Sequence, residues 1–199
     1  MSNPEVFRPR SNVVYGLTLF VLCVGLTGAS IVDGNFHNVL TAIVWSSLVC
    51  ATAFTLFIRP KIIFYDEGIV VINPFHRFTI GWGAVESIEA RYTMYLLVKD
   101  RDGSFRKVYA WAAPAPGRYH ARTIHPSEIK GMRIANPENM RPGESPRTHS
   151  GVAAHLARLR FDAFRSGDFA SARYEESFDR TTVLIIVGIA ISGIALWLS

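Results

Sequence analysis

The sequence predicts a membrane protein of mixed architecture, in which three spanning helices hold one small β-rich domain. The 21 Lys and Arg and the 16 Asp and Glu are almost absent from three long apolar segments and crowd into the middle of the chain. That middle divides into short runs of β-branched and aromatic residues separated by turn residues, which is typical of an antiparallel sheet. The chain therefore combines a part suited to lipid with a part suited to water.

The first two apolar segments, residues 13–32 and 39–58, are each long enough to cross a hydrocarbon core of about 30 Å. Asp33 is the only Lys, Arg, Asp or Glu in this whole stretch, and the short connection between the segments favours an antiparallel pair. Cleavage of the first segment as a signal peptide is the alternative, but its apolar core is longer than a signal needs and a second span follows at once. We expect a transmembrane hairpin over residues 13–58.

A third apolar segment, residues 181–199, is the shortest of the three. Lys and Arg lie before the hairpin, after it and before the third segment, whereas the hairpin loop carries none. By the positive-inside rule, the N-terminal residues 1–12 and the middle domain are then cytoplasmic, in a multi-pass protein of the plasma membrane. The three segments contain no Asp, Glu, Lys, Arg or His, which disfavours an ion or proton pathway.

Small residues within the spans predict packing rather than chemistry. Gly188 and Ser192 have the spacing at which two helices can approach closely. Cys23 and Cys50 are the only cysteines, and both fall inside apolar segments. We interpret them as small buried hydrophobic residues rather than as a disulfide or a redox pair.

Residues 59–112 have the pattern of short antiparallel strands. β-branched runs flank the acidic turn at 66–68, and an Asp-Gly pair at 102–103 separates two further runs, which is a strong hairpin signal. This spacing predicts a small sandwich or partial barrel. Four aromatic residues fall on the strand runs, and we interpret them first as core and strand-pairing residues and only second as a ligand platform: Trp82, Phe105, Tyr109 and Trp111.

The chain after these strands is irregular and then helical. Residues 113–149 are rich in proline and show no sustained periodicity, so we expect a long loop or insertion. Apolar residues then recur at helical spacing, which predicts an amphipathic helix over residues 150–167, with Ser150 as its N-cap and Gly167 as its stop. This helix would cap an open end of the sheet, and residues 168–180 would form the linker to the third span.

Several short motifs follow one another in the β-rich segment: Phe64-Tyr65, the acidic turn at 66–68, Trp82 with Val85, and the Asp-Gly pair at 102–103. As an ordered set they resemble the bacterial PH-like domain family of actinobacterial membrane proteins, the low-molecular-weight protein antigen 6 type. The resemblance covers residues 59–112. It implies a PH-type fold, which is an antiparallel sandwich closed by a C-terminal helix, and it implies no catalysis. The proline-rich insertion and the third span depart from the simplest members.

No catalytic, cofactor-binding or metal-binding constellation is recognisable in the sequence. The six histidines form no HExxH or similar pair, and there is no Gly-rich phosphate loop or GxSxG elbow. An enzyme acting at the lipid interface stays an alternative, because folding could bring residues such as His120 and Glu128 together.

Basic residues far outnumber acidic ones between positions 106 and 165. Near an anionic leaflet each basic residue is worth about 1 kcal/mol, so we interpret the excess first as a lipid-facing surface and second as recognition of a headgroup or an acidic partner. The acidic turn at 66–68 argues against phosphoinositide binding by the first hairpin, and we expect no nucleic-acid partner. The candidate contacts are Arg106, Lys107, Arg118, Arg122, Lys130, Arg133, Arg158, Arg160 and Arg165.

These observations predict a non-enzymatic, membrane-anchored PH-like interaction module, an accessory or scaffold component of a membrane or envelope complex. Its partners would be membrane lipids and an unidentified protein. A transport or channel component is one alternative, and a peripheral module that binds anionic lipid is another.

Overall fold

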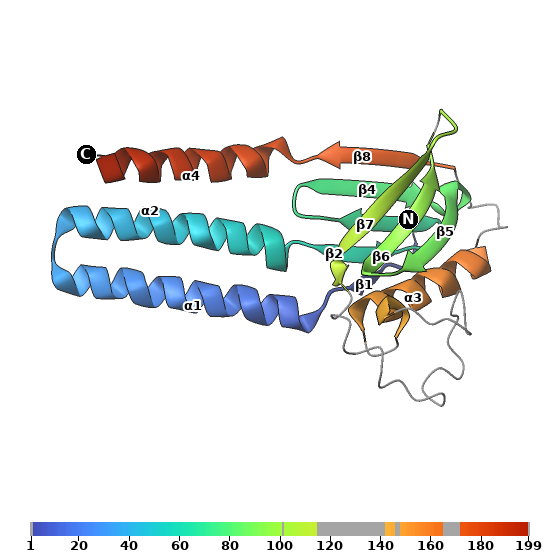
Figure 1. Cartoon of the computed structure of the whole chain (residues 1–199), viewed down its shortest axis with the longest axis horizontal. Coiled ribbons are helices and arrows are strands. Elements are labelled where there is room, and N and C mark those ends of the chain that lie inside the picture. The colour runs from blue at the N-terminus through green and yellow to red at the C-terminus, as the bar shows by residue number, and fades with distance from the viewer. Residues whose placement is uncertain (1, 101, 115–141, 146–147, 165–171, 199) are drawn as a thin grey trace. The chain divides into compact units, whose positions relative to one another are not determined.

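The computed structural model combines α-helices with antiparallel sheets, and it describes residues 2–100, 102–114, 142–145, 148–164 and 172–198 (Figure 1). The chain divides into two compact units. We call Met1–Pro9 with Lys61–Ser177 the β domain, and Arg10–Pro60 with Phe178–Ser199 the helical unit.

The helical unit contains three helices that are long and apolar enough to cross a membrane, as the sequence predicts. They are α1 Arg10–Asp33, α2 Phe36–Ala53 and α4 Arg180–Leu198, and α2 continues into a π-helical turn, Phe54–Ile58. The start of α2 precedes the apolar run because Asn35 caps it. The Asn35 side chain accepts hydrogen bonds from the backbone N–H groups of His37 and Asn38, at 3.0 and 3.4 Å.

Within the helical unit, α2 packs against both α1 and α4. The Thr27 hydroxyl donates to the Ser46 hydroxyl at 3.0 Å, which joins α1 to α2. On the other side, Gly193 of α4 is buried, and a Cβ atom there would lie 3.4 Å from side-chain atoms of Trp45 and Val44. A Cβ atom at Gly193 would therefore just fit, in van der Waals contact with both side chains.

The close helix contact differs from the one that residue spacing predicts. A Cβ atom on Gly188 would meet nothing within 4 Å, and Ser192 is exposed, with its hydroxyl donating to the Gly188 carbonyl at 3.0 Å. Residue spacing alone identifies a strip of small side chains on a helix, but not the direction in which that strip faces. Cys23 is buried, Cys50 is partly buried, and both are free thiols.

A polar cluster joins the end of the α2 segment to the start of α4. Asp179 caps α4 by accepting hydrogen bonds from the Thr182 backbone N–H at 3.0 Å and from the Thr182 hydroxyl at 2.7 Å. Arg59 forms an ion pair with Asp179 and also donates to the Thr182 hydroxyl at 3.2 Å. The bonds from Thr182, followed by the charge of Arg59, lower the pKa of Asp179 below its ordinary value.

Asp179→Ala should loosen the first turn of α4, because it removes both the cap and the ion pair, whereas Asp179→Asn keeps a capping oxygen. Because the pKa of Asp179 is lowered, its carboxylate stabilises the folded chain at any pH above 3.8, the ordinary pKa of the group. This contribution is lost as the pH falls through the lowered pKa. The protection factor of the Thr182 amide against hydrogen exchange should therefore be lower in the Ala variant than in the wild type at pH 7, and in the wild type it should fall only in acid. Equal protection in wild type and Ala variant at pH 7 would contradict this role.

The β domain contains a five-stranded antiparallel sheet with strand order β1-β2-β3-β4-β8 and a three-stranded sheet with order β5-β6-β7. The strands of the first sheet are β1 Glu5–Phe7, β2 Lys61–Phe64, β3 Gly68–Ile72, β4 His76–Gly81 and β8 Tyr174–Phe178. The second sheet is formed by β5 Val85–Ala90, β6 Thr93–Lys99 and β7 Phe105–Pro114, and one helix, α3 His149–Phe164, follows.

Two edge strands, β1 and β8, lie in segments that the sequence predicts to be a terminal segment and a linker. β1 is three residues long and β8 contains two glutamates, so neither shows the alternation that marks a strand. Their pairing comes from partners far along the chain. The Ser2 backbone N–H donates to both carboxylate oxygens of Glu67, at 3.0 and 2.9 Å, and the His76 ring bonds to Glu176 at 2.8 Å.

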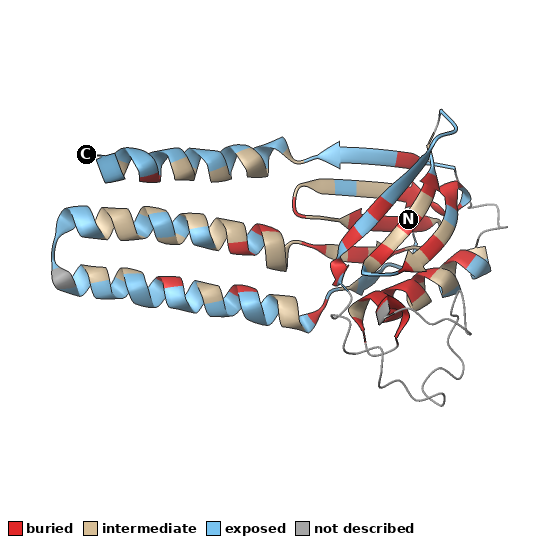
Figure 2. Cartoon of the chain, in the orientation of Figure 1, coloured by how far each residue is buried: buried red, intermediate tan, exposed pale blue. Residues whose placement is uncertain are grey.

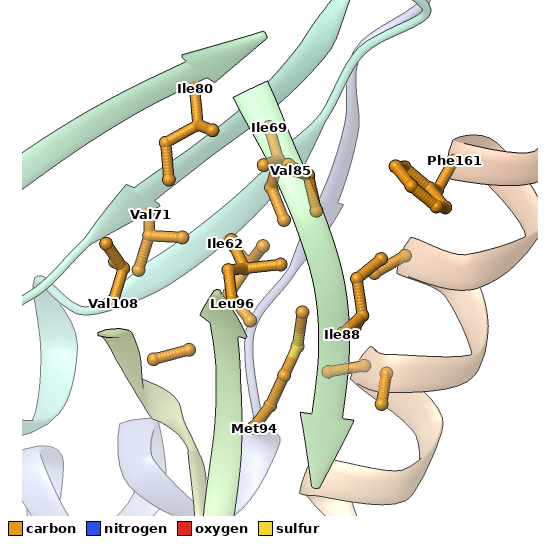
Figure 3. Close-up of a cluster of buried hydrophobic side chains, with 14 of the residues drawn as sticks. Ile62, Ile69, Val71, Ile80, Val85, Ile88, Met94, Leu96, Val108 and Phe161 are labelled. Atoms are coloured by element: carbon orange, nitrogen blue, oxygen red, sulfur yellow. The ribbon is translucent and has the colours of Figure 1, made fainter. Parts of the chain in front are cut away.

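The core of the β domain lies between the two sheets. Buried and exposed residues alternate along β6 and β7, as the period of a strand requires (Figure 2). Ile62 and Val71 from the first sheet lie close to Leu96 and Val108 from the second (Figure 3). This apolar contact between the sheets is the main hydrophobic interaction of the domain.

Helix α3 covers one end of the sandwich, as predicted. Its buried face is made mostly of small residues, including Ala153 and Ala157, which allow the helix backbone to approach the strands closely. Phe161 enters the same core (Figure 3), and its ring meets the Trp82 ring edge-on, with centroids 6.1 Å apart.

The start of α3 corrects one sequence prediction. Thr148, and not Ser150, is the N-cap, because its hydroxyl accepts a hydrogen bond from the Gly151 backbone N–H at 2.9 Å. The Ser150 hydroxyl instead donates to the Gly143 carbonyl at 2.7 Å and is fully buried. Gly167, the predicted stop, lies outside the described residues.

Gly151→Ala should destabilise the β domain although alanine favours helices over glycine by about 1 kcal/mol. A Cβ atom at Gly151 would overlap the backbone carbonyl oxygen of Ser145, which cannot rotate away. Denaturant unfolding of the full chain in detergent, followed by fluorescence of the buried Trp82, measures the effect. Ala163→Gly, an exposed position on the same helix, is the control and should cost only the propensity term of about 1 kcal/mol. A Gly151→Ala variant that is more stable than the wild type would refute the close approach.

Candidate functional site

The outer face of β7 carries a row of large exposed side chains. Phe105, Tyr109 and Trp111 are 58%, 52% and 52% exposed, and Lys107 lies between the first two. Val108 and Ala110, which alternate with them, are buried in the core. We call Phe105, Lys107, Tyr109 and Trp111 the aromatic row.

This arrangement corrects the core interpretation for Phe105, Tyr109 and Trp111. The strand-pairing interpretation is confirmed for Tyr109, which lies opposite Tyr95 of β6 with the two ring centres 5.4 Å apart. Of the four, only Trp82, which is 0% exposed, is a core residue, and its indole N–H donates to the Tyr65 carbonyl at 3.1 Å. Small residues occupy the inward positions of β7, so the large ones face outward. The second interpretation, a platform for a ligand, stays a prediction for the other three aromatics.

A pocket of about 270 Å³ opens beside the aromatic row on the second sheet. Lys107 and Tyr109 belong to both the row and the pocket, so the two form one continuous surface. We call the six residues that line this hollow the tyrosine pocket: Arg91, Tyr92, Thr93, Tyr95, Lys107 and Tyr109.

An irregularity in the β6–β7 ladder accompanies the tyrosine pocket. Tyr95 lies opposite Tyr109, but Thr93 lies opposite Pro114, so β7 contains extra residues between these two pairs. The Thr93 hydroxyl bonds to the carbonyl oxygens of Ala110 and Ala113 within the bulge, both at 2.9 Å. Bulges redirect side chains and often lie beside binding sites. Here the bulge interrupts the regular pairing of β6 with β7 at the tyrosine pocket.

The two cations of the tyrosine pocket lie over aromatic rings. The Lys107 ammonium is 5.6 Å from the centre of the Tyr95 ring, and the Arg91 guanidinium is 5.4 Å from the centre of the Tyr92 ring. The rings of Tyr95 and Tyr109 are 5.4 Å apart, so the wall of the pocket is a continuous aromatic surface.

One phenolic hydroxyl group of the tyrosine pocket is held by a hydrogen bond to a carboxylate. The Tyr95 hydroxyl donates to the Glu89 carboxylate at 2.6 Å, which orients its ring. Within the part of the chain that the structure describes, no carboxylate forms an ion pair with Lys107 or Arg91. The pocket therefore combines two cationic groups with phenolic hydroxyls, and its local charge is positive.

The basic residues predicted to contact an anionic surface separate into two groups. Arg158 and Arg160 bind carboxylates within the β domain, whereas Arg106 and Lys107 lie on the exposed part of β7, where Arg106 pairs with Asp100 at 2.8 Å. Only Lys107 among these four belongs to the tyrosine pocket. The remaining candidates lie outside the described residues: Arg118, Arg122, Lys130, Arg133 and Arg165.

Arg158 is part of a buried structural cluster. Its guanidinium donates to the Glu144 carboxylate at 3.1 Å and to the Ile88 carbonyl at 2.8 and 3.1 Å. The side chains of Arg158 and Glu144 are only 12% and 4% exposed. This pair joins α3 to β5 and to the 3-10 turn Pro142–Glu144, so it serves the fold.

Arg160 serves the acidic turn between β2 and β3. It pairs with Asp66 of that turn and with Glu5 of β1, and the Asn3 side chain also donates to Asp66 at 2.7 Å. Bonds from Ser2 lower the pKa of the neighbouring Glu67 below its ordinary value. The acidic residues of the turn thus bind the N-terminal segment and α3 and hold both in place.

The described residues offer no other centre of chemistry. Among them, no group of three or more His, Cys, Asp and Glu could hold a metal ion. His120 and Glu128, considered as an acid/base pair, lie outside the described residues. A second pocket, of about 480 Å³, lies between α1 and α2 and has lining residues such as Cys23, Gly28 and Ser46, without a charged group.

Comparisons with protein-family models, with curated proteins and with solved structures gave no match for this chain. Its function is therefore inferred from the chain's own geometry.

Arg158→Met should destabilise the β domain by about 3–5 kcal/mol, because it leaves the buried Glu144 carboxylate without its cation. Lys107→Ala, a change at an exposed cation, should stay within about 0.5 kcal/mol of the wild type. Denaturant unfolding in detergent compares the two variants. The double variant Arg158→Met with Glu144→Gln should regain part of the loss. Equal stability of Arg158→Met and Lys107→Ala would show that Arg158 is a surface residue.

Proposed function

We propose that this chain is a non-enzymatic, membrane-anchored docking module, and that a partner protein binds the aromatic row of its second sheet. The observation that carries the proposal is the exposure of Phe105, Tyr109 and Trp111 on the outer face of β7. Large aromatic side chains dominate the binding energy of protein interfaces, and a contiguous exposed group of them marks an interaction site. The module would serve as an accessory or scaffold component of a membrane complex.

The anchoring half of the proposal is supported by the three apolar helices. We propose that they cross the plasma membrane as a multi-pass protein with the β domain on the cytoplasmic side. The distribution of Lys and Arg around the apolar segments supports this orientation. The second pocket lies in the helical unit, but its lining carries no charged group, so a channel or transporter is less well supported.

We further propose that the β domain is PH-like. An antiparallel sandwich followed by a helix that packs against its core supports this assignment. The edge strands β1 and β8, together with the proline-rich segment before α3, are additions to the simple form of that fold.

Replacing Trp111 or Tyr109 with Ser should weaken partner binding at least thirtyfold, because truncating a central aromatic residue costs about 2 kcal/mol or more. The measurement is crosslinking in intact cells, followed by purification of the full chain in mild detergent and mass spectrometry. Leu159→Ser on α3, where the side chain is 41% exposed, is the matched control and should leave the crosslinked species unchanged. A chain that always migrates alone, or a Leu159→Ser variant that loses the partner equally, would refute the proposal.

A further inference from the structure

We infer that the tyrosine pocket receives a carboxylate side chain from an acidic segment of the partner protein. This inference rests on the proposed docking function and specifies its chemistry. The aromatic row would supply contact area, and the tyrosine pocket would select partners that place an Asp or Glu at one position.

Charge complementarity is the first argument. Lys107 and Arg91 both line the tyrosine pocket, and neither is paired with a carboxylate among the described residues. The Glu89 carboxylate, the nearest acidic group on the paired strand, already accepts the Tyr95 hydroxyl at 2.6 Å. An incoming carboxylate would therefore gain two cations that no described carboxylate neutralises, and charge-assisted hydrogen bonds are the strongest that a side chain can form.

Preorganisation is the second argument. A long basic side chain on a protein surface loses rotamer freedom when it binds, and this loss weakens exposed ion pairs. In the tyrosine pocket each cation already lies over a ring, and the Thr93 hydroxyl holds the bulge through two carbonyl oxygens. Part of the ordering cost is thus met before the partner arrives.

Size and position are the third argument. Pockets for drug-sized molecules occupy about 300–1,000 Å³, and this one, at about 270 Å³, is smaller and has room for an acidic side chain. It shares Lys107 and Tyr109 with the aromatic row. A peptide whose acidic side chain enters the pocket would therefore place its apolar neighbours against the row.

The test uses the full chain in phosphatidylcholine nanodiscs and two capped peptides, acetyl-Phe-Glu-Leu-Glu-Phe-amide and its twin with Gln in place of Glu. We expect calorimetric titration to give at least tenfold tighter binding of the Glu peptide. Lys107→Glu and Arg91→Glu should each weaken its binding at least tenfold. Lys99→Glu makes the same charge change on β6, opposite Phe105 but outside the pocket, and should change the affinity less than threefold.

Each contrary outcome has a distinct meaning. Equal binding of the two peptides, no binding of either, or equal weakening by Lys99→Glu would overturn the inference. So would pocket-dependent binding of phosphatidylglycerol vesicles without binding of the Glu peptide, because the ligand would then be a lipid headgroup. If Trp111→Ser removes the crosslinked partner while Lys107→Glu and Arg91→Glu retain it, the docking face stands and the acidic preference fails. If Trp111→Ser also retains the partner, the docking function itself fails.

Discussion

The contact between the two sheets is the constraint on which the rest of the β domain depends. Val108 and Ala110 must face Ile62 and Val71 to close the core. Because successive side chains on a strand point to opposite faces, the residues between them are forced outward. The aromatic row is thus the other side of the same alternation. A shift of β7 by one residue would bury Lys107 and expose the core, so the row and the core specify a single register.

The sequence predicts the helices and most strands because their signals are local. Charge-free apolar runs of sufficient length mark the helical unit, and the Asp-Gly turn marks the β6–β7 hairpin. The edge strands β1 and β8 escape detection because contacts distant in sequence hold them, such as Ser2 with Glu67. The sequence does not reveal which way the aromatic residues of β7 face, and the reason is different. The period shows that its aromatic residues share a face, but not that the alanines of α3 and β7 already fill the space inside.

The chemistry of the charged residues was the least predictable feature, because a count of arginines does not reveal their partners. Arg158 and Arg160 are basic like Lys107, but their charges have different partners. Arg160 reaches Asp66 across 94 positions of the chain, and Arg158 reaches the carbonyl of Ile88 across 70. Both guanidinium groups are used to fasten α3 to the sandwich. Arg91 gave no signal at all in the sequence, since only the β6–β7 bulge and the β5–β6 turn bring it beside Lys107.

The edge of β7 shows why a partner would bind the face of the sheet and not extend it. An open strand edge with aromatic side chains invites pairing with any extended chain. Asn73 blocks this pairing, because its side-chain amide donates to the Tyr109 carbonyl at 2.8 Å and accepts from the Trp111 backbone N–H at 2.9 Å. The backbone carbonyl of Tyr109 and the backbone N–H of Trp111 are therefore satisfied within the domain. Recognition therefore depends on the side chains. Lys107 lies between the aromatic rings, and its charge disfavours non-specific binding of an uncharged apolar surface.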